Sequence, residues 1–137
     1  MAASTSPNIA SVTSLYGTTV GFALDTTVTT DLITVSANKI LRITTLLVAN
    51  IDGTNSADVT LALVLADADP NGITDFDPTS GQPWYIAKTV AVPADSTLSI
   101  LDTPLYLRAG DVLEGGASAN SDLQLVVSYE VFDDAPI

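Results

Sequence analysis

Oxygen-bearing side chains recur at short intervals in the segment from Asp67 to Asp77. The segment reproduces the first half of a calcium-binding loop, D-x-D-x-N-G, with a glycine at the position of the sharp turn. The candidate calcium ligands are Asp67, Asp69, Asn71, the backbone carbonyl of Ile73, and Asp75, with Asp77 as a replacement ligand. The pattern is incomplete because Pro78 stands where a bidentate glutamate belongs. We therefore expect a solvated acidic turn, with a calcium site as the alternative.

The composition excludes several kinds of chemistry. The chain has no histidine and no cysteine, and four basic residues stand against sixteen acidic ones, which gives a net charge of -12. Without imidazole and thiol groups, the usual general bases, nucleophiles and zinc ligands are missing. The acidic balance disfavours binding to nucleic acids or nucleotide phosphates. No G-x-S-x-G motif occurs, and nothing in the sequence places a carboxylate pair in a pocket. We expect a structural or binding protein and not an enzyme.

Trp84 and Tyr85 are adjacent aromatic residues that open a predicted strand. We expect them to close the edge of the core beneath the preceding loop. The alternative is an interface anchor or a surface on which a sugar stacks, because Trp and Tyr are common hot-spot residues. They are the candidate interface residues of the chain.

The elements that must position these residues are short strands separated by turn signals such as Asp52-Gly53, Ala109-Gly110-Asp111 and Gly115-Gly116. The candidate strands are 15–24, 31–36, 39–49, 57–66, 84–92, 97–101, 111–117 and 123–132. About eight strands and no long apolar stripe at helical spacing predict an all-β fold, an antiparallel β-sandwich that is jelly-roll-like. An immunoglobulin-like sandwich is the alternative.

Alternation along the strands predicts which residues face the core. In 123–132 the odd-numbered residues are apolar, so Val127 faces inward and Gln124 outward. Leu63 belongs to the inward set of 57–66. The segment 84–92 alternates in the same way, except that Lys88 interrupts the apolar set. The segment from Ile40 to Val48 is apolar on both faces at its end, which indicates a central strand or a bulge.

The domain organisation is predicted to be simple. Residues 1–14 are rich in Ser, Thr and Ala and are expected to form a flexible N-terminal arm, whereas 15–137 form a single sandwich domain. The first residues lack the basic and apolar regions of a secretory signal, and no apolar run approaches the roughly 20 residues of a membrane span. We expect synthesis in the cytoplasm and no membrane partner.

Three stretches carry a resemblance to a known class of protein. The first is the strand 39–50 followed by a small-residue turn and 57–65; the second is 89–100. The third is Leu105-Tyr-Leu-Arg-Ala-Gly-Asp-Val112, followed by Gly/Ala/Ser-rich sequence and a final strand to residue 132. This order resembles small β-sandwich structural proteins of tailed bacteriophages, including capsid decoration (cement) proteins and some tail or neck components.

The resemblance implies a virion structural protein, and in particular a decoration protein that binds and stabilises the capsid shell. It implies the major capsid protein of the same virus as partner, a homo-oligomer with a trimer favoured over a dimer, and a location on the capsid surface after synthesis in the host cytoplasm. No cofactor and no nucleic acid are expected. The alternatives are a tail or neck component, and a carbohydrate-binding sandwich that uses Trp84, Tyr85 and the 67–77 loop.

Overall fold

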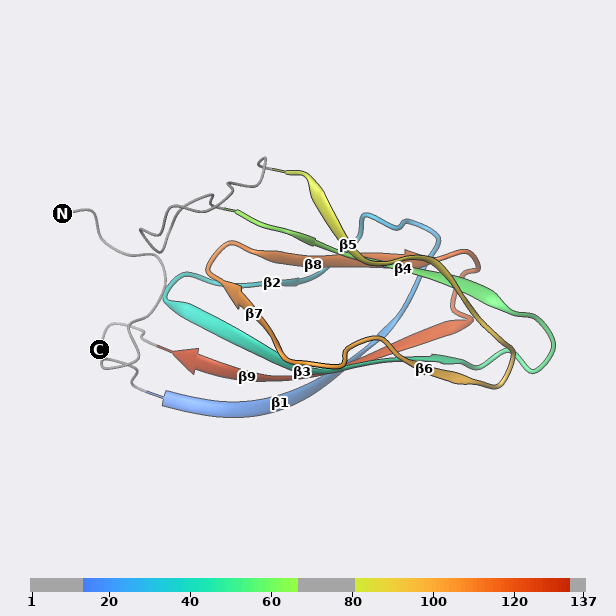
Figure 1. Cartoon of the computed structure of the whole chain (residues 1–137), viewed down its shortest axis with the longest axis horizontal. Coiled ribbons are helices and arrows are strands. Elements are labelled where there is room, and N and C mark those ends of the chain that lie inside the picture. The colour runs from blue at the N-terminus through green and yellow to red at the C-terminus, as the bar shows by residue number, and fades with distance from the viewer. Residues whose placement is uncertain (1–13, 67–80, 134–137) are drawn as a thin grey trace.

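The computed structural model describes residues 14–66 and 81–133, and these residues form strands and connections without a helix (Figure 1). Nine strands are present in this part of the chain: β1 (Ser14–Ala23), β2 (Asp31–Thr34), β3 (Lys39–Asn50), β4 (Ala57–Val64), β5 (Pro83–Val92), β6 (Thr97–Ser99), β7 (Leu105–Arg108), β8 (Val112–Ala117) and β9 (Leu123–Asp133). Across the described residues, no helix is long and apolar enough to cross a membrane.

The strands form two antiparallel sheets that lie one above the other (Figure 1). Sheet A has the order β1-β9-β3-β6, and β7 pairs with β3 beside β6; sheet B has the order β2-β8-β4-β5. The pairing is nested, which means that strands from the two ends of the chain pair first and strands nearer the middle pair inside them. Thus β1 pairs with β9, β2 with β8, β3 with β6 and β7, and β4 with β5. The predicted antiparallel β-sandwich is confirmed. The jelly-roll designation stays a prediction, and this nested order favours it.

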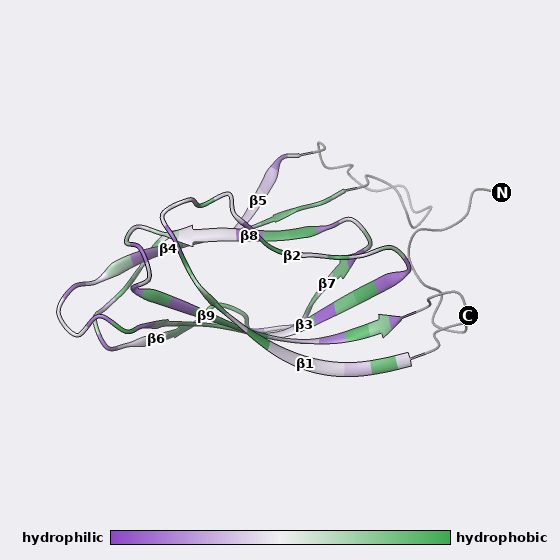
Figure 2. Ribbon diagram, turned by 180° about the vertical axis from the view of Figure 1, so that it is seen from behind, coloured by the Kyte–Doolittle hydropathy of each residue, from purple (hydrophilic) through white to green (hydrophobic). Residues whose placement is uncertain are grey.

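The core lies between the sheets and is built from the apolar face of each strand. Bands of hydrophobic and hydrophilic residues alternate along β3 and β9 (Figure 2). The largest fully buried side chains are Leu24, Ile43, Leu46, Leu61, Leu107, Leu113, Leu123, Leu125, Val48, Val59, Val92 and Val127. The predicted register of β9 is confirmed, because Val127 is fully buried and Gln124 is exposed. Leu63 packs against the core as a partly buried residue.

The structure has the bulge that was one of two alternatives for the third strand, and it differs from the sequence pattern in two details. The register of β3 against β9 shifts between Ile43 and Thr45, which lets both halves of β3 keep an apolar face inward. Residues 105–108 form β7, a strand that the sequence pattern did not separate from the preceding connection. Gly115-Gly116 is part of β8 and not a turn. A Cβ on Gly115 would lie 2.5 Å from the Thr60 carbonyl oxygen, so these glycines serve close packing.

Candidate functional site

The predicted calcium ligands Asp67, Asp69, Asn71, Ile73 and Asp75, together with Asp77, lie outside the described residues. The calcium hypothesis therefore stays a prediction. Within 14–66 and 81–133, no group of three or more acidic residues is arranged to hold a metal ion.

Trp84 and Tyr85 do not form one aromatic surface. Trp84 stands opposite Leu63 and Tyr85 opposite Ala62, so the two rings project from opposite faces of β5. Both are accessible, with exposed fractions of 36% and 48%. A single ligand lying flat on the sheet therefore meets only one of the two rings.

The charged residues are distributed unevenly between the two sheets. Of the acidic residues in the described ranges, only Glu130 and Asp133 lie on strands of sheet A, and both are in ion pairs, with Arg42 and Lys39. The others lie on sheet B or in connections: Asp25, Asp31, Asp52, Asp58, Asp95, Asp102, Asp111, Glu114 and Asp122. Sheet A also carries three of the four basic residues of the chain, since Arg108 ends β7. Every acidic residue on the strands of sheet A is therefore in an ion pair.

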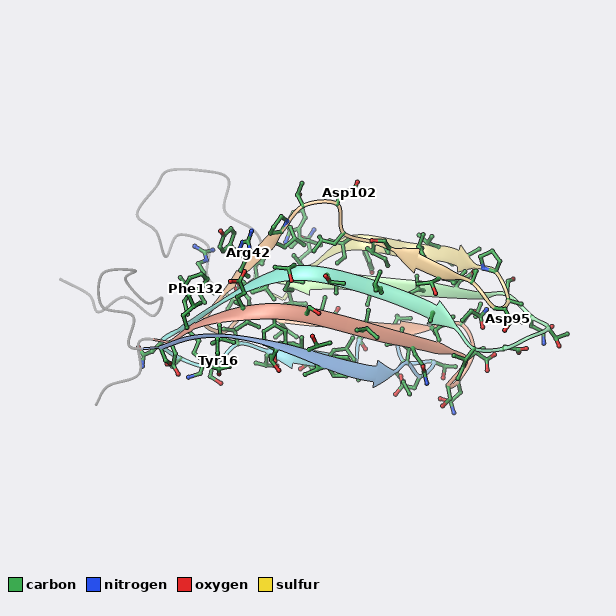
Figure 3. All side chains as sticks on the ribbon, turned by 90° about the horizontal axis from the view of Figure 1, so that it is seen from below. Tyr16, Arg42, Asp95, Asp102 and Phe132 are labelled. Carbon is green, nitrogen blue, oxygen red and sulfur yellow. The ribbon has the colours of Figure 1, made fainter. Side chains whose placement is uncertain are left out.

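The outward-facing residues of sheet A, here called the sheet A face, form rows across the strands. Figure 3 looks onto this surface, where β1, β9 and β3 run side by side and Arg42 and Phe132 lie toward one end. One row is Leu15, Phe132, Ile40 and Arg108, and the next is Gly17, Glu130, Arg42 and Tyr106. A row toward the other end is Gly21, Val126, Leu47 and Ser99. The face is mainly apolar or hydroxylated.

An ion pair between Arg42 of β3 and Glu130 of β9 lies at the centre of one row. A hydrogen bond from the Arg42 guanidinium to Glu130 raises the pKa of Arg42, so this side chain keeps its positive charge at every physiological pH. Tyr106 stands opposite Arg42 in the register and is 62% exposed, which makes it the most accessible large aromatic side chain described. This row offers an aromatic ring beside a neutralised charge.

Two shallow hollows mark the sheet A face where glycines replace side chains. One, of about 520 Å³, is lined by residues that include Gly17, Thr19 and Ser128. The other, of about 280 Å³, includes Gly21. A Cβ at Gly17 or Gly21 would meet only a carbonyl oxygen at 3.9 Å, an ordinary contact. The sandwich itself therefore has room for side chains at both positions.

A third hollow, here called the sheet B groove, lies on the outer side of sheet B. It has a volume of about 310 Å³ and is lined by Thr26, Val28, Asp58, Thr60, Tyr85, Lys88, Thr89, Ala117 and Ser118. One wall is the connection between β1 and β2, which runs along β8 through hydrogen bonds from Ala117 N–H to the Asp25 carbonyl and from Gly115 N–H to the Thr30 carbonyl. Gly116 permits this approach, because a Cβ there would lie 2.6 Å from the Thr27 carbonyl oxygen. The opposite wall is β5.

Two β-bulges in β5 bring Lys88 into the groove. The register places Tyr85 opposite Ala62, Ala87 opposite Leu61 and Val90 opposite Val59, so β5 has one extra residue in each interval. Regular alternation would direct Lys88 toward the core together with Trp84 and Val90. The second bulge instead sets Lys88 beside Thr89 on the outer side, where its ammonium lies 4.8 Å from the centroid of the Tyr85 ring.

Thr89 has an unusual backbone conformation at the second bulge. Its φ is 53°, in the left-handed region that β-branched residues rarely adopt. The Thr89 N–H donates to the Thr60 Oγ at 3.1 Å, and this bond secures the bulge against β4. Sequence reasoning did not identify Asp58, Thr60 or Thr89; the only signal was the interruption of an apolar alternation by Lys88.

Glu114 is a buried carboxyl on the outer side of sheet B, where it stands opposite Ala62 and Asp31. Burial, and secondarily the charge of Asp31, raises the pKa of Glu114.

The comparisons with known proteins add no relative. No protein-family model, no curated protein and no solved structure matches the chain.

Proposed function

We propose that this chain is a structural protein of a bacteriophage virion, a decoration protein that binds the outer surface of the capsid shell through its sheet A face and stabilises the shell. The observation that carries the proposal is the segregation of charge. Sheet A has no unpaired acid among its described residues, although the chain has a net charge of -12.

A docking face must lose its water at little cost. Burying an unpaired carboxylate is expensive, and the centres of protein interfaces are accordingly depleted of charged residues. On the sheet A face Glu130 is already neutralised by Arg42, and Tyr106 supplies the kind of aromatic anchor that interfaces favour. Arg108 has no ion pair among the residues that the structure describes, and it suits an acidic group of the shell protein.

Gly17 and Gly21 support the same assignment. Glycine within a strand destabilises a protein by roughly 0.5–1 kcal/mol relative to alanine, and neither position requires glycine for packing inside the sandwich. Glycine in a strand often marks a place where another backbone approaches closely. The two glycines therefore fit a surface that receives a partner.

The remaining surface suits the outside of a particle. Nine of the described acids lie on sheet B and the connections, and a strongly acidic outer surface resists association between particles and repels stray nucleic acid.

The test is co-sedimentation of the purified protein with capsids that lack it. The wild-type chain is expected to sediment with the shells. Gly21→Leu should fold but lose binding, because its side chain fills a hollow of the sheet A face. The matched control is Ala91→Leu, which introduces the same side chain at an exposed position on the outer side of β5 and should leave binding intact.

Three results would contradict the proposal. The wild-type chain could fail to bind the shells, or Gly21→Leu could bind as well as Ala91→Leu. If Gly21→Leu instead alters the mass of the free protein, the sheet A face is an interface between copies of the chain and not the shell-binding surface.

A further inference from the structure

We infer that the sheet B groove binds a neutral saccharide of one or two hexose units. This function is separate from shell binding, because the groove lies on the opposite sheet from the sheet A face. A protein docked through sheet A would present this groove to the outside.

The groove contains hydroxyl donors that have no acceptor in the described part of the chain. Thr60 Oγ accepts the Thr89 N–H at 3.1 Å, and Ser118 Oγ accepts the Asp58 N–H at 2.8 Å. Each hydroxyl therefore has its own hydrogen left to donate. Thr60 is only 8% exposed, so its hydroxyl hydrogen has little access to water, although the oxygen already accepts the Thr89 N–H. A ligand oxygen in the groove would accept the hydrogen bond that this hydroxyl can still donate.

Acceptors and apolar surface accompany these donors. The Asp58 carboxylate lines the groove and accepts hydrogen bonds, whereas the Lys88 ammonium donates them. A sugar hydroxyl both donates and accepts, so it matches this mixture. Val28 and the Tyr85 ring provide apolar contact for the C–H faces of a sugar ring.

The charges of the groove exclude other ligand classes. Asp58 and Lys88 balance each other, so the groove attracts neither sign of charge strongly. An anion would in addition be repelled by the net charge of the chain, and a divalent cation would be opposed by Lys88. The volume of about 310 Å³ is at the lower end of the range for small-molecule sites. A small neutral polyol is the class that fits.

The backbone around the groove is arranged in a way that the sandwich alone does not require. Two bulges in β5 place Lys88 and Thr89 on the outer side, and Thr89 adopts an unfavourable left-handed conformation there. Bulges and strained residues of this kind concentrate at ligand-binding sites, where they re-aim side chains.

Titration calorimetry tests the inference, with cellobiose, maltose and lactose as neutral probes and glucuronic acid as an anionic one. At least one neutral disaccharide is expected to bind the wild-type protein. Tyr85→Ala should weaken that binding tenfold or more. Trp84→Ala is the matched control, because this neighbouring ring is similarly exposed but projects from the other face of β5; its affinity should be unchanged.

The inference is overturned if none of the three disaccharides binds, if Tyr85→Ala binds as well as Trp84→Ala, or if glucuronic acid binds more tightly than every neutral probe. Near-ultraviolet circular dichroism of both variants establishes that they are folded. Because Tyr85 lies away from the sheet A face, Tyr85→Ala should still sediment with capsids, so the two functions can fail independently.

Discussion

Replacing Thr89 by glycine should stabilise the protein, although glycine usually weakens a strand. A non-glycine residue held in a sparsely populated backbone region costs about 1–3 kcal/mol, and Thr89 is β-branched at a φ of 53°. Glycine adopts this conformation freely but loses roughly 0.5–1 kcal/mol through the entropy of the unfolded chain. The Thr89 side chain is exposed, so little packing is lost, and its N–H still reaches Thr60. We expect a net gain of about 1 kcal/mol from the middle of these ranges, and of no more than about 2.5 kcal/mol.

Urea denaturation measures this change, with the m-value checked for constancy. The control is Thr97→Gly, an exposed position in β6 that does not have a positive φ. This control has no strain to relieve and should lose roughly 0.5–1 kcal/mol. The two substitutions therefore have opposite predicted signs. Equal destabilisation by both would refute the reasoning, because it would mean that Thr89 carries no backbone strain.

Four further predictions concern the core, pH, assembly and calcium. Val127→Asp should abolish cooperative melting, because it buries an unpaired charge at a fully buried position. Gln124→Asp, on the exposed face, should melt near the wild-type temperature. If both variants melt like the wild type, the register of β9 is refuted. Burial raises the pKa of Glu114 above its unfolded value, so the stability linked to its protonated form is complete at low pH and is lost as pH rises through the folded pKa. Glu114→Gln should therefore be more stable than wild type near neutral pH but not in acid. A stability difference that does not change with pH would contradict this. Light scattering should give the mass of a trimer, reduced by deletion of residues 1–14, and a monomer unaffected by the deletion would argue against the predicted assembly. Melting midpoints in calcium and in chelator should coincide at fixed ionic strength; a higher midpoint in calcium that Asp67→Ala abolishes would instead identify a calcium site.

The sequence predicts those parts of the fold that depend on local alternation. In β9 every second residue is apolar and the strand is regular, so its buried set, including Val127, follows directly from the period of two. The bulge of β3 was one of two alternatives that the sequence left open, since an apolar run that changes face needs an extra residue.

The bulges of β5 could not be read in this way. Two extra residues together restore the original alternation, so Trp84 and Val90 keep the same face with or without the bulges. Only Lys88, at a position that regular alternation would bury, indicates that the strand is irregular. The sheet B groove therefore depends on a feature that hydrophobic periodicity conceals.

The sheet A face depends on pairings between distant parts of the chain. The segments 14–23, 39–50 and 105–108 are visibly free of acid in the sequence. That they become neighbours in one sheet follows from the pairing of β1 with β9 and of β3 with β7 and β9, which local patterns do not determine. Likewise Gly115-Gly116 has the signature of a turn, but its reason is tertiary close packing.

The most direct test of the proposed function is an electron-microscopy map of the intact virion that carries this chain. The proposal predicts density for the sandwich on the outer surface of the capsid, with β1, β9 and β3 against the shell and β5 facing solvent. Density confined to the tail or neck, or a copy on the shell bound through sheet B, would contradict it.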